Sequence, residues 1–243
     1  MKVFVIAFVI LGIVTPAAAQ FAVQYESPAL KSGKVHVSRV VLTPVTGLVS
    51  QLDWKAGPYD MGKPLEVESR QLEKDLFPVV DATLKGLGFV VDDKFLSPDA
   101  LAGNKDLGDK VKQIETMFDM EYSEIAMYKK RFQNEAVSLG EDVPALHLPE
   151  DSDALVIVQV RDYLETGGKK FMNGSPGLHS VGGWDVEVGI VDAKTGAILF
   201  IARSDGGNNL VKEPDKAGPK IEKSFKDYFK YAAAPSGPRE AKP

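Results

Sequence analysis

Carboxylates and three histidines are the side chains best suited to chemistry, because the chain contains no cysteine. Without a thiol there is no disulfide, no thiolate metal site and no cysteine nucleophile. His36, His147 and His179 lie far apart in the sequence and show none of the clustered spacings of a metal site. We therefore predict neither a metal ion nor another cofactor.

Motifs for a serine nucleophile or a phosphate-binding loop do not occur either, so we predict no catalytic residue. Carboxylates are frequent near predicted strand ends, at Asp92-Asp93 and Glu150-Asp151. Two carboxyl groups can perform acid–base chemistry when a cleft brings them together. One alternative is therefore a secreted hydrolase that depends on Asp93 or Asp151, although solvated loop acids are the simpler interpretation.

The loop from Glu165 to Gly183 is the candidate contact region. It is long for a connection between two strands, and such loops often carry function. Its centre places two charges beside two apolar groups, a mixture that is frequent in protein interfaces; these residues are Lys169, Lys170, Phe171 and Met172. Deleting the four is expected to leave thermal stability unchanged and to weaken capture of a native partner in a pull-down.

The first 19 residues have the order of a secretory signal peptide. Lys2 precedes an apolar run from Val3 to Val14, and Ala17-Ala18-Ala19 supplies the small residues of a cleavage site. The run is about a dozen residues, whereas a membrane-spanning helix needs roughly 20. We predict a periplasmic or secreted protein with no transmembrane segment after cleavage.

The remaining chain is predicted to form one α/β domain over residues 20–231, followed by a disordered tail over 232–243. A net charge of −5 argues against binding to nucleic acid and to anionic lipid. Apolar periodicity predicts a mixed sheet of about five strands packed against two or three helices, one of them long.

The helical patterns cover 65–87, 109–139 and 214–231, and Pro78 is expected to kink the first helix or to start a second one. Strand patterns cover 34–45, which Pro44 should end, and 89–95, 153–163, 184–190 and 197–203, with a turn from Asp192 to Gly196 between the last two. The segment from Thr46 to Pro64 is predicted to be a loop.

The segments "LTPVTG", "LKGLGFVVDD", "DALVIVQVRDY" and "VGIVDAKTGAILFIARSDG" occur in an order that resembles a group of envelope proteins. The group comprises the curli-secretion-channel lipoproteins, the penicillin-binding-protein activator lipoproteins and the N-terminal domain of the Tol-Pal propeller protein. The resemblance implies a binding or scaffold domain without catalytic residues. Ala19-Gln20 stands where a lipidated cysteine would be, and paired amphipathic membrane strands are not evident, so the resemblance does not extend to a secretion pore.

The leading hypothesis is thus an exported, non-enzymatic binding or scaffold domain of the bacterial cell envelope, whose partner is an envelope protein or a second copy. For self-association we expect the helix from Asp109 to Leu139 to pack between copies. Met120, Tyr122 and Met127 lie off its main apolar stripe and are the candidate contacts.

Overall fold

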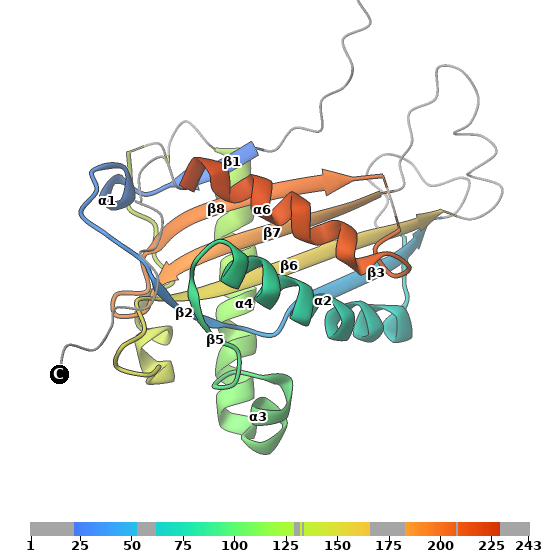
Figure 1. Ribbon diagram of the computed structural model, residues 1–243, viewed down its shortest axis with the longest axis horizontal. Coiled ribbons are helices and arrows are strands. Elements are labelled where there is room, and N and C mark those ends of the chain that lie inside the picture. Colours follow the sequence, from blue (N-terminus) through green and yellow to red (C-terminus); the bar gives the residue numbers. More distant parts are fainter. Residues whose placement is uncertain are drawn as a thin grey trace, which may run out of the picture.

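The structure is a computed structural model that describes residues 22–52, 62–128, 132, 134–165, 183–207 and 209–228. These residues form a mixed eight-stranded sheet with helices on both faces, which confirms the predicted α/β class (Figure 1). The predicted number of strands was too low. The predicted signal peptide (1–19), the tail (232–243) and the contact loop with Lys169–Met172 lie outside the described residues.

The main path of the sheet has the order β1 (Ala22–Glu26), β8 (Ile198–Gly206), β7 (Gly183–Asp192), β6 (Ala154–Glu165), β2 (Arg39–Leu42) and β5 (Val90–Asp92). The first four strands pair antiparallel, and β6, β2 and β5 pair parallel. β3 (Thr46–Leu52) also pairs parallel with β6, and β4 (Lys63–Pro64) pairs antiparallel with β3. Both β3 and β4 fall in the segment predicted to be a loop, so that prediction was wrong.

One long strand, β6, pairs along the same edge first with β2 and then with β3. The register brings Leu42 opposite Val156 and Thr46 opposite Gln159, so one extra residue bulges between β2 and β3. Pro44 lies in this bulge and has no N–H to donate to β6. It ends β2 as predicted, but the chain resumes pairing two residues later.

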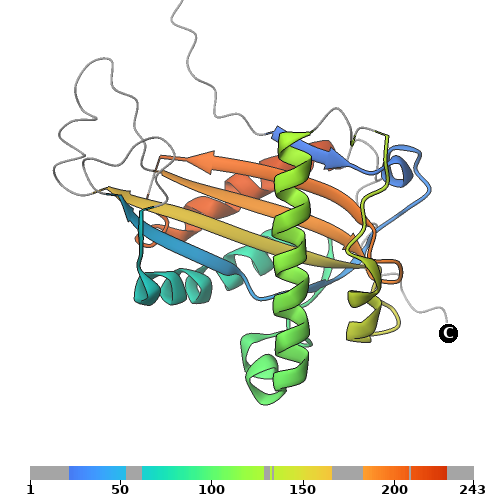
Figure 2. The ribbon, with the colours of Figure 1, turned by 180° about the vertical axis from the view of Figure 1, so that it is seen from behind.

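Two helices cover one face of the sheet, and a single helix crosses the other (Figures 1 and 2). The first face carries α2 (Glu66–Gly86) and α6 (Ala217–Tyr228), and the second carries α4 (Lys105–Met127). Short helical turns complete the described chain: α1 (Pro28–Lys31), α3 (Pro98–Gly103), η2 (Gly140–Asp142), η3 (Pro144–Leu146) and η4 (Pro214–Lys216). Across the described residues, none of the helices combines the length and apolar character needed to cross a membrane.

Pro78 does not divide α2, which is a single helix of 21 residues. Its buried stripe continues on both sides of the proline at four-residue spacing, through Leu72, Leu76, Val80 and Leu84. Pro78 itself is exposed, so the carbonyl that loses its intrahelical partner is on the solvent side of the helix. Packing of the continuous stripe against the sheet therefore outweighs the lost hydrogen bond.

The long helix α4 ends at Met127, twelve residues before the predicted end at Leu139. Backbone pairing accounts for the difference: Leu139 N–H donates to the Gly196 carbonyl at 2.8 Å, and Ile198 N–H donates to the Val137 carbonyl at 2.8 Å. The later segment therefore lies along the hairpin. Tyr122, predicted to lie off the stripe, is buried in it with Phe118 and Ile125.

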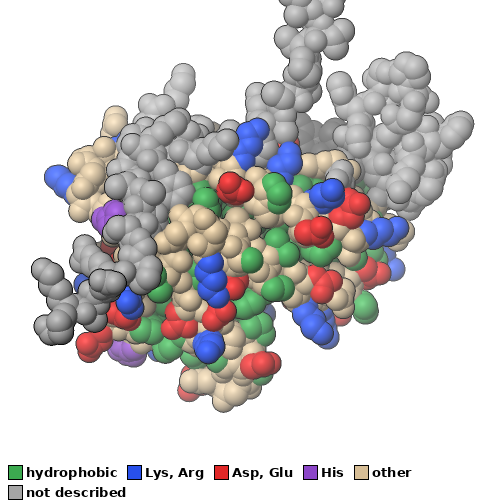
Figure 3. Space-filling view, viewed as in Figure 1, with side chains coloured by type: hydrophobic (Ala, Val, Ile, Leu, Met, Phe, Trp, Pro, Cys, Tyr) green, Lys and Arg blue, Asp and Glu red, His purple; other side chains and the backbone are tan. Residues whose placement is uncertain are grey.

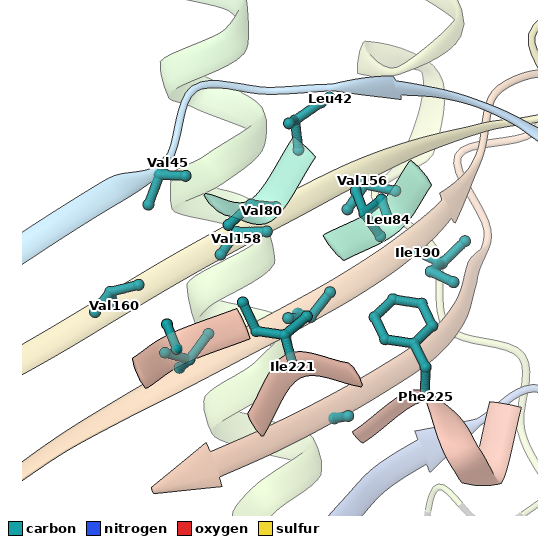
Figure 4. Close-up of a cluster of buried hydrophobic side chains, with 14 of the residues drawn as sticks. Leu42, Val45, Val80, Leu84, Val156, Val158, Val160, Ile190, Ile221 and Phe225 are labelled. Atoms are coloured by element: carbon teal, nitrogen blue, oxygen red, sulfur yellow. The ribbon is translucent and has the colours of Figure 1, made fainter. Parts of the chain in front are cut away.

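Alternate residues of the central strands form two separate cores. The core under α2 and α6 includes Val156, Val158, Ile190 and Phe225 (Figure 4). It also holds an aromatic cluster of Phe89, Phe200, Phe225 and Tyr228, with ring centroids 5.4 to 6.0 Å apart. The core under α4 contains the side chains that alternate with these and point to the opposite face of the sheet, including Leu155, Ile157, Val191 and Ile201.

Candidate functional site

The α4-facing surface of the sheet changes from apolar to charged along the strands. Beyond the apolar residues of the α4 core, two successive rows cross β6, β7 and β8. Register pairs Gln159 with Glu187 and Glu187 with Arg203 in the first row. The second row contains Arg161, Asp185 and Asp205. Because α4 lies over these strands, Glu187 and Asp185 are buried inside the protein, whereas Arg203 and Asp205 on β8 are exposed.

Arg161 is the centre of the resulting ion-pair network. Its guanidinium nitrogens lie 2.7 Å from Asp119 of α4 and 3.0 Å from Glu187. Asp185 is 3.8 Å from Arg161 and 3.1 Å from Arg203, so it links the two cations. Tyr122 of α4 lies close enough to Glu187 and Arg203 for their charges to shift the pKa of its hydroxyl. The network ties α4 to three strands of the sheet.

Burial raises the pKa values of several acidic groups in this network. Glu187 is 1% exposed, and its loss of hydration raises the pKa of its carboxyl to about 7, against the opposing charge of Arg161. Burial also raises the pKa of Asp185 and of Tyr122. Within the part of the chain that the structure describes, Glu187 Oε2 and Gln159 Oε1 have no hydrogen-bond donor. The network therefore has more acceptors than donors.

Beside the network lies a cavity of about 610 Å³, which we call the α4 groove. It lies between α4, the bulge before β3 and the middle of β6. Its apolar lining comes from Pro44, Val45, Leu48, Leu101, Gly108, Val111 and Val160, and its polar lining comes from Thr46, Glu73, Lys112, Glu115, Thr116, Asp119, Gln159 and Arg161. A concavity that combines apolar side chains with convergent polar groups is typical of a binding site.

Two carboxylates from opposite sides of the sheet meet at the start of β3. They can do so because the sheet edge is open there: β4 pairs only with Ser50 and Gln51. Glu73 of α2 accepts a hydrogen bond from the Gly47 N–H at 3.0 Å. Burial raises the pKa of Glu115 of α4 to about 7; a hydrogen bond with Thr46 opposes the rise, and the charge of Glu73 adds to it.

The carboxylates singled out from the sequence are not brought together. Asp93 follows β5 and forms an ion pair with Lys85 at 3.1 Å, while Asp151 precedes β6 and forms an ion pair with Arg39. Since β5, β2 and β6 are parallel, the two acids lie at opposite ends of these strands. The described residues also contain no group of three or more His, Asp or Glu side chains that could hold a metal ion.

The buried acids of β7 were missed because this strand appeared half-exposed. Asp185 and Glu187 alternate with Trp184 and Val186, and this pattern predicts a solvent-facing side. In the structure β7 is buried on both sides over its central residues, because α4 covers the polar one. The available signal was Gln159 and Arg161 within the most apolar strand of the chain.

A first prediction concerns the pH dependence that Glu187 gives to folding. The pKa of Glu187 is higher in the folded chain than in the unfolded chain, so the folded state binds more protons between about pH 4 and 7. Its contribution is present at low pH and is lost as pH rises through this window, on the order of 3 kcal/mol in total. Glu187→Gln should lack this slope, so the unfolding free energy of wild type should fall relative to that of the variant as pH rises, measured by urea denaturation from pH 4.5 to 8.

The matched control is Glu124→Gln, which changes an exposed carboxylate of the same helix that covers Glu187. This variant should keep the wild-type slope. Parallel curves for Glu187→Gln and wild type would show that Glu187 titrates as an ordinary carboxyl.

No known protein family, curated protein or solved structure matches the chain.

Proposed function

We propose that the protein is an exported, non-enzymatic binding domain of the bacterial cell envelope, and that the α4 groove holds another envelope component. The observation that carries the proposal is the groove itself: about 610 Å³, open at a sheet edge and lined by both apolar and polar side chains. Export follows from the predicted signal peptide, and an envelope role also follows from the resemblance of the strand and hairpin segments.

Another concavity supports the choice of the α4 groove by contrast. It lies between α2 and α6, has about 600 Å³ and is lined by residues such as Ala82, Gly218 and Pro219. It has no buried side chain among its lining residues that lacks a hydrogen-bond partner in the described structure. Figure 3 shows this side of the molecule, where acidic, basic and apolar side chains are interspersed.

The test is a capture experiment from a periplasmic extract with two matched tryptophan variants. Leu48→Trp fills the α4 groove from a partly exposed lining position, and Ala82→Trp fills the concavity between α2 and α6. Wild type and Ala82→Trp should retain the same envelope component, and Leu48→Trp should lose at least nine-tenths of it. Undiminished capture by a folded Leu48→Trp variant would contradict the proposal.

A secreted hydrolase is the second candidate, favoured by the carboxyl of Glu115. A groove carboxyl with a pKa of about 7 is suited to general acid–base catalysis, and Glu73 provides the second carboxylate. This candidate requires turnover on a peptide or glycan panel that Glu115→Gln abolishes. Capture without turnover favours the binding domain.

Self-association is the third candidate, favoured by exposed apolar side chains on the outer side of α4. Met120 and Met127 are 65% and 68% exposed. Tyr122 no longer belongs to this surface, since it is buried against the sheet. Light scattering at high protein concentration distinguishes a dimer from a monomer.

A further inference from the structure

We propose that the α4 groove binds an alkylammonium group, and that a lysine side chain of the partner presents it. The inference rests on the proposed function and deepens it by naming the chemistry of the ligand.

The groove has more negative than positive charge available to a ligand. Glu73, Glu115 and Asp119 contribute three carboxylates, of which Asp119 is paired with Arg161, so Glu73 and Glu115 remain available. Of the cations that line it, Arg161 is already held by Asp119 and by two buried carboxylates of β7. Lys112 is exposed, and it makes no ion pair within 4 Å with either Glu73 or Glu115 among the described residues. A cationic ligand would supply the counter-charge.

A buried amide supplies an independent sign of a hydrogen-bond donor. Gln159 lines the groove and is only 9% exposed. Its Nε2 donates to the backbone carbonyl of Glu115 at 3.0 Å, and because a carbonyl can only accept, this bond fixes the orientation of the amide. Oε1 is therefore left as an acceptor with no donor among the described residues. An ammonium group has three N–H donors and no acceptor.

The remaining lining suits the chain that carries the ammonium group. Pro44, Leu48 and Leu101 are partly exposed and provide apolar surface in the groove. A lysine side chain can lay its four methylene groups on such a surface while its charged end reaches an acceptor. The groove volume also exceeds that of one side chain, which leaves room for neighbouring residues of a peptide segment.

Glu115 gives the interaction a pH signature. Its neighbours are Thr46 of β3, Glu73 of α2, and Lys112 and Asp119 of its own helix, with Arg161 of β6 engaged by Asp119. Because burial raises the pKa of Glu115 to about 7, binding of an ammonium group below that pH must displace a proton. Affinity should fall up to tenfold per pH unit below 7 and stay level above it.

The experiment titrates the protein lacking residues 1–19 with a short capped peptide containing one lysine, and follows the amide signals of Thr46, Gly47 and Glu115 by NMR. The expected result is saturable binding at pH 8, at least tenfold weaker for the same peptide with norleucine in place of lysine. Glu115→Gln should weaken binding at least tenfold and abolish its pH dependence, whereas Glu124→Gln should change neither. Equal binding of the norleucine peptide, or unchanged binding by Glu115→Gln, would overturn the inference.

Free 1,5-diaminopentane is the third probe and identifies the source of the amine. Weaker binding of the diamine than of the lysine peptide supports a peptide ligand. Equal or tighter binding of the diamine would overturn that assignment in favour of a small amine. The Leu48→Trp capture result keeps the two proposals distinguishable. If Leu48→Trp loses capture but the lysine and norleucine peptides bind equally well, the binding function stands and only the proposed alkylammonium ligand is contradicted.

Discussion

Replacing Gly189 with alanine is expected to destabilise the protein by about 3 kcal/mol or more, through overpacking of the α4 core. A Cβ atom at Gly189 would lie 2.3 Å from Phe118 Cε2 and 2.4 Å from Cζ, well inside contact distance. The Phe118 ring cannot move aside freely, because it is fully buried over the row formed by Ile157, Gly189 and Ile201. The glycine leaves the space that lets α4 approach the sheet.

Urea denaturation of three variants tests this contact. Gly86→Ala is the control, because Gly86 lies in the last turn of α2 with open space around the Cβ position, and alanine there should be neutral or stabilising. Phe118→Ala alone should cost about 3 to 5 kcal/mol. The double variant Gly189→Ala/Phe118→Ala should be more stable than the sum of the two losses, because each change makes room for the other. A Gly189→Ala variant as stable as Gly86→Ala would disprove the close approach.

Replacing Arg161 with methionine is the second change with a large expected effect. The substitution leaves Glu187, Asp185 and Asp119 without their shared cation, and an uncompensated buried charge typically costs about 3 to 5 kcal/mol. The loss should be greatest above pH 7. At lower pH it should shrink, because protonation of Glu187 removes one of the uncompensated charges.

Unfolding free energies at pH 5 and pH 8 measure this effect. Arg70→Met is the matched control: Arg70 pairs with Glu66 at 3.8 Å on the exposed surface of α2, and its loss should cost less than about 0.5 kcal/mol. Adding Glu187→Gln to Arg161→Met should restore part of the lost stability at pH 8, because the most buried of the three charges is then absent. Equal losses for Arg161→Met and Arg70→Met would show that the network contributes no more than a surface ion pair.

The sequence was sufficient for the parts of the fold whose local patterns agree with their environment. β6 is apolar on both sides and is central, and the turn from Asp192 to Gly196 has the expected positive φ of 65° at the glycine. β3 was missed because it follows Pro44 and includes Gly47, which are typical of a loop. Its pairing is supplied by β6, more than 100 residues later in the chain.

The candidate site depends even more on distant contacts. Whether Glu187 faces water or a helix is decided by α4, which precedes β7 by more than 50 residues. Alternation in β7 shows that the two sides of the strand differ, but not what covers each side. The ordinary carboxylates Asp93 and Asp151 were the most conspicuous acids, whereas Glu115 has no distinguishing neighbour in sequence.

Successive side chains of β6 and β7 point to opposite faces of the sheet, so neighbouring residues of one strand have different roles. Val158 and Val186 pack in the core under α2 and α6. The intervening residues Gln159 and Glu187 lie on the face covered by α4 and carry its polar and charged groups. Substitutions at the α4-facing positions Gln159 and Glu187 can therefore change the charge on that side without altering the neighbours that hold α2 and α6. The two sides of the same strands are thus free to diverge independently.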